Sequence, residues 1–210
     1  MNILLIDGHP DTGRFSSHLL DIYQSALPAD ATVTRVNVRD LRFDPVLRKG
    51  YVKRIAWETD IASLAEKFDA CDHVAFAFPM WWGSEPAELK GLIDRLFLPG
   101  FMYAFREEGA LWDKLLAGRS GDVIATMDTP PFILRLLHGN PIIRRWKGQI
   151  LGFVGFDPVR FLACGAIKDG AAEKHLAKWT RKIERMATSI RPKSPEKKKA
   201  RLANFLNLPA

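Results

Sequence analysis

Short apolar runs alternate along the chain with segments in which apolar residues recur every three or four positions. The runs at 3–6, 73–78 and 123–125 are almost wholly apolar, and a further one lies at 160–167. Runs of this kind are typical of strands that are buried on both faces. Residues 33–38 instead alternate apolar and polar side chains, as a half-buried edge strand does. The pattern therefore predicts five strands.

Four segments with helical spacing lie between or after these runs. Their apolar residues are three or four positions apart, as on one face of an amphipathic helix. The segments are 15–26, 57–68, 89–97 and 176–186. Buried strands separated by amphipathic helices indicate a parallel sheet with helices on both faces, an α/β three-layer sandwich. Five strands fit the flavodoxin-like strand order better than the six-stranded Rossmann order.

The composition fits one domain followed by a basic tail. With 210 residues, 47% apolar and 26% charged, the chain can build a sizeable core, which excludes wholesale disorder. The only compositional break follows Ile190, so we expect a domain over 1–190 and a tail over 191–210. Of the net charge of +7, residues 191–201 supply +5, from six basic residues and one acidic. Because this segment lacks interleaved aromatic residues, no nucleic-acid partner is expected; it is a solvated tail or a contact for an anionic membrane or a partner subunit.

Neither a membrane span nor a disulfide is expected. No apolar run approaches the roughly 18 uncharged residues that a membrane-spanning helix needs. The first apolar run meets Asp7 after four residues and follows no basic segment, which indicates a buried strand and not a signal peptide. Without export, Cys71 and Cys164 are expected to be buried thiols, and no CxxC or CxxH pair suggests a metal site. The expected location is the cytoplasm.

The loop after the first strand has the features of a phosphate site. Residues 8–17 lead directly into a helix, whose unpaired N–H groups and nearby hydroxyls suit a phosphate monoester. The loop has no GxGxxG motif, and it places Arg14 and Phe15 where a Walker A motif needs Lys and Ser or Thr. The alternative is that Ser16 and Ser17 only cap the helix.

Two further loops follow strands whose carboxyl ends share the same edge of such a sheet, where ligands bind. One contains the adjacent Trp81 and Trp82, just before a helix that begins near Pro86. A flat aromatic ligand would use an indole as a platform; the alternative is that both indoles pack beneath the next helix. The other loop, 126–132, is stiffened by two prolines and is rich in small polar side chains.

Three stretches together resemble the flavodoxin-like NAD(P)H:quinone oxidoreductase family, which includes quinone reductases, modulator-of-drug-activity proteins and ancillary subunits of potassium-efflux systems. Residues 78–97 are similar to the signature FP(L/M)xWxxxPAxLKGxxDRxF nearly position by position. Residues 7–16 resemble the family's phosphate-binding turn, and the sequence LGFVGF at 151–156 resembles the element before its last strand. The resemblance extends from Asn2 to about Ile190.

The resemblance implies a flavin, FMN or alternatively FAD, and no metal. It implies a ping-pong transfer of hydride from NAD(P)H through the flavin to a quinone or related aromatic acceptor, in a homodimer with the site at the interface. The implied flavin-binding residues are His9, Phe15, Ser16 and Ser17 for the phosphate, Pro79, Met80, Trp81 and Trp82 for the ring system, and Thr126, Met127, Asp128 and Thr129 for its pyrimidine edge. Many quinone reductases have the sequence Thr-Thr-Gly-Gly where this chain has residues 126–129, so the contacts of this loop with the flavin are expected to differ.

His138 is the candidate catalytic residue, because it falls where the mammalian-type enzymes have an active-site histidine. The tyrosine that accompanies it there is replaced by Phe132. His138 is either a proton donor or a surface residue at a helix end. Two other classes remain open: an electron-carrier flavodoxin, whose acidic docking surface does not fit a body charge of only +2, and a regulatory subunit of a membrane transporter, which only the tail supports.

Overall fold

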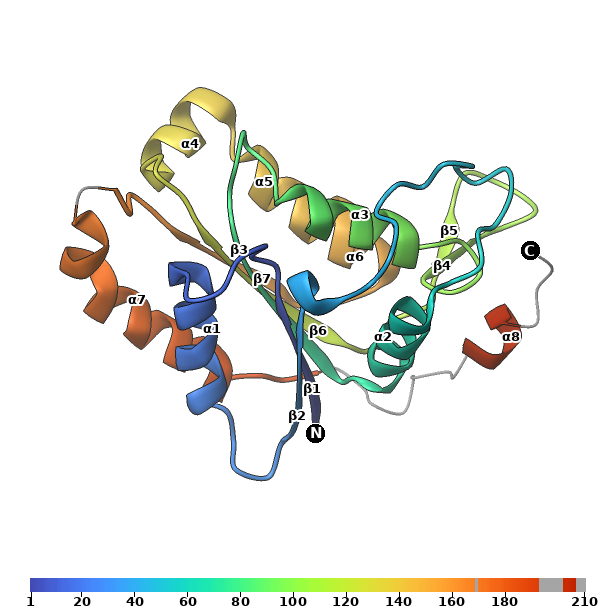
Figure 1. Ribbon diagram of the computed structural model, residues 1–210, viewed down its shortest axis with the longest axis horizontal. Coiled ribbons are helices and arrows are strands. Elements are labelled where there is room, and N and C mark those ends of the chain that lie inside the picture. The colour runs from blue at the N-terminus through green and yellow to red at the C-terminus, as the bar shows by residue number, and fades with distance from the viewer. Residues whose placement is uncertain (169, 193–201, 207–210) are drawn as a thin grey trace.

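The computed structural model describes residues 1–168, 170–192 and 202–206, and it centres on a five-stranded parallel sheet in the order β2-β1-β3-β6-β7 (Figure 1). The strands of this sheet are β1 (Asn2–Asp7), β2 (Thr32–Asn37), β3 (His73–Pro79), β6 (Ser120–Thr126) and β7 (Val159–Cys164). All four strand pairs are parallel. The five predicted strands and the flavodoxin-like order are confirmed, and β2 is a half-buried edge strand as its alternation predicts.

All four predicted helices are present: α1 (Phe15–Ser25), α2 (Thr59–Ala70), α3 (Ala87–Leu96) and α7 (Ala171–Thr188). The expected start of α2 at Trp57 is two residues early, because Glu58 keeps an extended backbone at the N-cap position. The Trp57 indole instead donates a hydrogen bond to the Arg95 carbonyl over 2.9 Å.

Several elements have no counterpart in the sequence prediction: most are too short for a period to be read, and the helical run over 141–154 has a π-helical middle that departs from the 3.6-residue period. They are η1 (Val38–Asp40), β4 (Tyr103–Phe105), β5 (Trp112–Lys114), α4 (Pro131–His138), α5 (Pro141–Arg144), η2 (Arg145–Ile150), α6 (Leu151–Val154) and α8 (Leu202–Leu206). Strands β4 and β5 form a separate antiparallel hairpin. Helix α5, the π-helical η2 and α6 follow one another directly along the chain.

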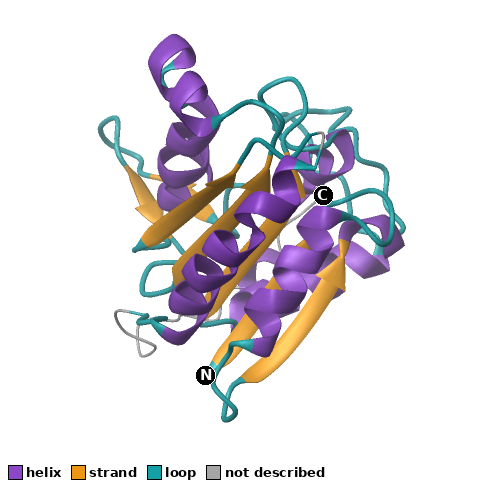
Figure 2. Ribbon diagram, turned by 90° about the vertical axis from the view of Figure 1, so that its left-hand side faces the viewer, coloured by secondary structure: helices purple, strands orange, loops and turns teal. Residues whose placement is uncertain are grey.

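The helices cover both faces of the sheet, as the alternating side chains of β1 show. Leu4 and Ile6 belong to the core cluster that contains the buried residues of α2 and α3, whereas Ile3 and Leu5 pack with those of α1 and α7. Figures 1 and 2 show α1 and α7 together on one face of the sheet. The three-layer sandwich is therefore confirmed, and its layers leave the carboxyl ends of the strands at one edge.

A buried polar network ties four elements together at the amino ends of the central strands. Asp122 accepts hydrogen bonds from Arg160 over 2.7 and 2.6 Å and from the Tyr23 hydroxyl over 2.7 Å. Tyr23 also lies 2.9 Å from Nε2 of His73. Burial raises the pKa of Asp122, but the hydrogen bonds from His73 and Arg160 outweigh burial and hold that pKa below its usual value. Asp122 is thus a buried carboxylate whose charge Arg160 balances.

The described part of the tail folds back onto the domain. Phe205 of α8 is buried, with its ring centroid 4.5 Å from that of Trp57 and 5.7 Å from that of Phe101. The Arg54 guanidinium lies over the Phe205 ring, 4.8 Å from its centroid. The rest of the expected basic tail, apart from residues 191 and 192, lies outside the described residues, and the domain boundary at 190 stays a prediction.

The structure also bears on two further expectations, which concern membrane-spanning helices and the two cysteines. Among the described residues, no helix has the length and apolar character needed to cross a bilayer. Cys71 and Cys164 are both buried thiols, and they belong to core clusters on opposite faces of the sheet. Burial raises the pKa of Cys164 to about 12, so this thiol is inert near neutral pH.

Candidate functional site

The turn after β1 brings the backbone unusually close to the neighbouring strand and helix. A Cβ atom on Gly8 would lie 2.5 Å from a Leu89 methyl carbon and 3.1 Å from the Phe78 Cβ. The Gly8 N–H donates to the Ala77 carbonyl over 2.8 Å. Glycine is required here because only a residue without a side chain can pass between β3 and α3.

A buried carboxylate organises this turn, and the sequence prediction gave it no role. Asp7 is fully buried and accepts hydrogen bonds from the His9 backbone N–H over 3.2 Å and from Arg39 over 2.9 Å. Arg35 approaches the same carboxylate at 3.4 Å. Arg39 also donates to the His9 carbonyl over 3.3 Å, so one side chain links Asp7 and His9 at the start of the turn. The available signal was an aspartate at the end of an apolar strand, which requires a cationic partner when buried.

Helix α1 begins with polar groups that have no partner in the fold. Ser16 and Ser17 lie in its first turn and are 1% and 7% exposed, and neither hydroxyl has a hydrogen-bond partner. The N-cap residue is Arg14, whose side chain makes no capping bond, so the alternative that the serines cap the helix is wrong. Two buried hydroxyls at the positive end of a helix dipole fit a phosphate group, which would satisfy them and the unpaired N–H groups.

The loop after β3 displays both indoles at this edge of the sheet. Trp81 and Ser84 exchange backbone hydrogen bonds over 2.9 and 3.0 Å, closing a tight turn in which Trp82 and Gly83 have φ angles of 50° and 78°. Two successive positive φ angles define a type I′ turn, which a bulky residue such as tryptophan rarely adopts. The Trp81 side chain is half-exposed and that of Trp82 is fully exposed. The alternative that both indoles pack beneath α3 is therefore wrong.

Contacts between the three loops bring some of the candidate residues together at this edge of the sheet. The ring of His9 meets the Trp81 indole edge-on, with centroids 5.7 Å apart and planes at 84°. Desolvation lowers the pKa of His9, with Arg14 adding to the effect and Asp7 and Asp11 opposing it. The Met80 N–H donates to the Thr126 carbonyl over 2.7 Å, which joins the second loop to the third.

The first two residues of the third loop are buried and bonded to neighbouring segments through their backbone, so the part of the loop that is open to a ligand is Asp128 and Thr129. Thr126 and Met127 are buried, and the Met127 N–H donates to the Cys164 carbonyl of β7 over 2.9 Å. Asp128 is exposed and Thr129 is half-buried. A Cβ atom on Gly165, the residue after β7, would lie 2.6 Å from the Thr129 carbonyl oxygen, so the chain that leaves β7 packs directly against this loop.

An ion-pair network that the sequence prediction missed braces the tryptophan loop. Glu85 is buried, forms an ion pair with Arg145 and accepts a hydrogen bond from the Trp146 indole over 3.1 Å. Arg145 also donates to the Ser84 hydroxyl over 3.0 Å. Because its partners are 60 residues apart, nothing local in the sequence identifies this brace.

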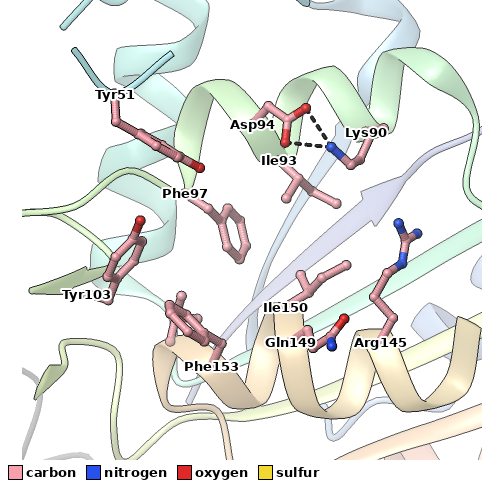
Figure 3. A pocket seen from close by; sticks show the side chains of 11 residues that line it. Tyr51, Lys90, Ile93, Asp94, Phe97, Tyr103, Arg145, Gln149, Ile150 and Phe153 are labelled. Carbon is pink, nitrogen blue, oxygen red and sulfur yellow. Dashed lines mark hydrogen bonds and ion pairs between the residues drawn. The ribbon is translucent and has the colours of Figure 1, made fainter. Parts of the chain in front are cut away.

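A cavity of about 310 Å³ lies between α3 and the helical segment from η2 to α6 (Figure 3). Its wall is mainly apolar and aromatic, with Lys90 and Asp94 paired over 2.6 Å on one side and Arg145 on the other. No residue of the predicted site lines it. It shares Arg145 with the brace of the tryptophan loop and so adjoins the site from the side of α3.

His138 is the last residue of α4 and is exposed. Helix α4 projects from the same upper region of the molecule in which the β6 strand ends (Figure 1). Of its residues only Leu134 is buried, while Phe132, Leu136 and Leu137 are 64%, 76% and 74% exposed. The position fits both alternatives for His138, a proton donor at the edge of the site and a residue at a surface helix end.

Comparisons with known proteins place this geometry in a family. The family model described as a flavodoxin-like fold matches residues 1–186. The chain belongs to this family. An FMN-dependent NADH:quinone oxidoreductase of Cereibacter sphaeroides is 33% identical over 169 residues, which are 76% of this chain and 83% of the relative. The solved structure of Smu.1420 from Streptococcus mutans UA159 has a TM-score of 0.76 and 27% identity, and it covers 90% of this chain and 100% of its own.

Two further relatives are matched over a shorter part of their length. Rat NAD(P)H dehydrogenase [quinone] 1 is 29% identical over 138 residues, which are 60% of this chain and 47% of the rat protein. An uncharacterized NAD(P)H oxidoreductase of Escherichia coli, YcaK, is 31% identical over 109 residues, 48% of this chain and 55% of the relative. The chain thus spans about half the length of these two relatives.

Proposed function

We propose that this chain is a flavin-dependent NAD(P)H oxidoreductase that reduces quinones or related aromatic acceptors, with FMN as its flavin. The observation that carries the proposal is the pair of buried serine hydroxyls without partners at the start of α1, in a loop whose His9 contacts the exposed Trp81. The names of the Cereibacter and rat relatives give the same reaction class.

The residues of the chain divide the binding of the flavin among three loops. Ser16, Ser17 and the first N–H groups of α1 bind the phosphate, and His9, which contacts Trp81, belongs to the same loop. The indoles of the second loop offer a flat apolar surface to the ring system. The backbone of the third loop and the side chains of Asp128 and Thr129 face the pyrimidine edge.

A bound flavin supplies the hydride-transfer chemistry that protein side chains lack. The chain contributes binding, orientation and proton supply. Reduction of a quinone leaves developing oxyanions, so we assign His138 the role of proton donor. With donor and acceptor using one site in turn, we expect ping-pong kinetics.

We also propose a homodimer in which α4 contributes to the interface. Three large apolar side chains of this helix are exposed in the single chain, and an unpartnered apolar surface of this kind marks an association site. The expected cytoplasmic location stays a prediction.

The test combines flavin binding with turnover. Purified protein titrated with FMN is expected to quench flavin fluorescence, and the holoprotein is expected to oxidise NADH or NADPH when a quinone such as menadione is present. Flavin released by heat identifies FMN or FAD by chromatography. FMN binding without NAD(P)H oxidation would favour the electron-carrier or regulatory alternatives, and failure to bind any flavin would refute the proposal.

A further inference from the structure

Helix α7 presents a stripe of positive charge to solvent. Five basic side chains are exposed at spacings of three and four residues: Lys174, Lys178, Arg181, Lys182 and Arg185. At 100° per residue they fall within an arc of about 100° on the helix. The buried residues Trp179, Ile183 and Ala187 lie on the opposite side, against the sheet. Figures 1 and 2 show α7 in the outer layer, with no other described element lying over its outer side.

The stripe has no counter-charge of its own. The two acidic residues of α7, Glu173 and Glu184, both project to one flank of the helix, outside the arc. In the part of the chain that the structure describes, none of the five cations forms an ion pair. Three pairs of like charge are four residues apart, an arrangement that destabilises a helix. Apart from Arg185, whose place in the last turn suits the helix dipole, the cations gain no partner from the described part of the fold, so we look to binding for the role of the stripe.

The charge of the whole chain gathers at this helix and just beyond it. Residues 171–201 contain 11 basic and 3 acidic residues, a net charge of +8, whereas the chain as a whole carries +7. All other residues together therefore have a net charge of −1. The flavin-binding part of the molecule is close to neutral, and one segment carries all of its excess positive charge.

We propose that the exposed face of α7 binds the anionic surface of a lipid bilayer. The five cations form a band about 17 Å long, at 1.5 Å per residue, which suits a plane of diffuse negative charge. The stripe contains no aromatic or large apolar side chain, so it lacks the anchors of a protein interface and the stacking platforms of a single-strand binder. Binding is electrostatic and peripheral, because the apolar side of α7 is committed to the core.

This inference goes beyond the proposed flavin chemistry and does not depend on it. Its consequence for that chemistry is location, since many quinones partition into lipid. A peripheral enzyme that is held at the bilayer surface meets such acceptors where they are concentrated. The test therefore measures membrane binding and not turnover.

The experiment is co-sedimentation of the full chain with vesicles of phosphatidylcholine alone or with 30 mol% phosphatidylglycerol added. We expect binding only to the anionic vesicles and release at high salt. In the double variant Lys178→Gln/Lys182→Gln the partition coefficient is expected to fall about 25-fold, from roughly fivefold for each cation lost near the surface. The matched control Lys49→Gln/Lys53→Gln removes two exposed lysines elsewhere and should change it less than about twofold.

Folding of the variants is checked by circular dichroism, and a variant that unfolds is replaced by Lys174→Gln/Arg185→Gln. Equal binding to neutral and anionic vesicles overturns the inference, as does a loss of the same size in both double variants, which would show a net-charge effect only. If the protein does not bind vesicles but binds duplex DNA or an acidic protein through α7, the inference is also overturned, in favour of that other polyanion.

Discussion

Ser16 and Ser17, whose buried hydroxyls have no hydrogen-bond partner among the described residues, are the most informative residues of the site. A buried hydroxyl that makes no hydrogen bond destabilises a fold by about 1–3 kcal/mol. The chain has two of them in the same turn, Ser16 and Ser17, where a helix N-terminus already attracts anions. The local structure of α1 thus lowers the stability of the empty protein in a way that a phosphate would reverse.

Replacing either serine by alanine should lower FMN affinity without lowering the stability of the flavin-free protein. We expect Ser16→Ala and Ser17→Ala each to weaken FMN binding about tenfold or more, since a hydrogen bond to a charged group contributes roughly 1.5–3 kcal/mol. The free energy of unfolding of the flavin-free protein should be unchanged or slightly higher, because no bond is lost. Fluorescence titration and urea denaturation measure the two quantities.

Two controls separate the phosphate from the rest of the flavin. Riboflavin lacks the phosphate, so its affinity should be the same in the wild type and in both variants. Ser25→Ala, at the exposed end of the same helix, should leave FMN affinity unchanged. Equal losses for FMN and riboflavin would contradict a phosphate role for the two serines.

His138 is the residue on which proton supply depends in the proposed reaction. A positioned general acid contributes about 10²–10⁴-fold to such a step. We expect His138→Gln to lower turnover with a quinone by at least about tenfold, with flavin affinity unchanged. Ferricyanide takes one electron and needs no proton, so its reduction should suffer much less. Wild-type rates with both acceptors would make His138 a surface residue and solvent the proton source.

At the scale of elements, α4 is a helix whose apolar residues mostly lack a packing partner in the single chain. Leu136 and Leu137 are about three-quarters exposed, so charged substitutions there should leave the monomer folded. We expect Leu136→Asp/Leu137→Asp to convert the proposed dimer into a monomer in sedimentation velocity. Val52→Asp, at another exposed apolar position, should leave the dimer intact. A dimer that survives in the α4 variant would place the interface elsewhere.

Phe205 is the buried side chain with which helix α8 packs on the domain, helped by the half-buried Leu202 and by a hydrogen bond from Arg54 to the Phe205 carbonyl. Phe205 is 3% exposed between Trp57, Phe101 and Arg54, whereas the adjacent Leu206 is 49% exposed. Phe205→Ala is expected to lower the free energy of unfolding by about 3 kcal/mol through the cavity it leaves. Leu206→Ala should change it by less than about 0.5 kcal/mol. Urea denaturation compares the two, and equal effects would contradict the packing of α8 on Trp57.

FMN affinity supplies a second readout on the tail. Phe205 lies away from the three loops, so its loss should not change flavin binding. Deletion of residues 193–210 should likewise leave FMN binding intact while lowering stability. Loss of flavin binding on deletion would show that the domain boundary at 190 is too early.

At the scale of the whole molecule, Asp122 and Arg160 join the neighbouring strands β6 and β7 to α1 and α7. Removing Arg160 leaves a buried carboxylate without its counter-charge, which typically destabilises by about 3–5 kcal/mol. We expect Arg160→Gln to do so at pH 7, whereas Arg181→Gln on the exposed side of α7 should have little effect.

The pH dependence of this effect has a definite sign. In the wild type the pKa of Asp122 is below its usual value, so the stability it contributes is present above about pH 4 and is lost as the pH falls through the lowered pKa. In Arg160→Gln one of the two partners that oppose burial is lost, so we expect the pKa of Asp122 to be higher than in the wild type and the folded variant to take up a proton at a higher pH. The stability gap between wild type and variant should therefore shrink from pH 7 toward pH 4. Denaturation at several pH values measures the gap; a constant gap would contradict the assignment.

The sequence by itself determined the layers, the strand order and the edge at which ligands bind. Apolar runs and helical periods are local signals, and each of the five strands produced one. Once the strands are parallel, the loops that begin after Asp7, Pro79 and Thr126 must meet at one edge, so the candidate residues could be grouped before any contact was known. The buried thiols also followed from local surroundings.

Only the tertiary structure decided which polar groups are paired. The Asp7–Arg39 contact, the Glu85–Arg145 brace and the packing of Phe205 on Trp57 join residues 32, 60 and 148 positions apart. No period encodes such partners, because they depend on how whole elements approach one another. The same reason explains the serines: their hydroxyls are visible in the sequence, but burial without a partner is a property of the folded chain alone.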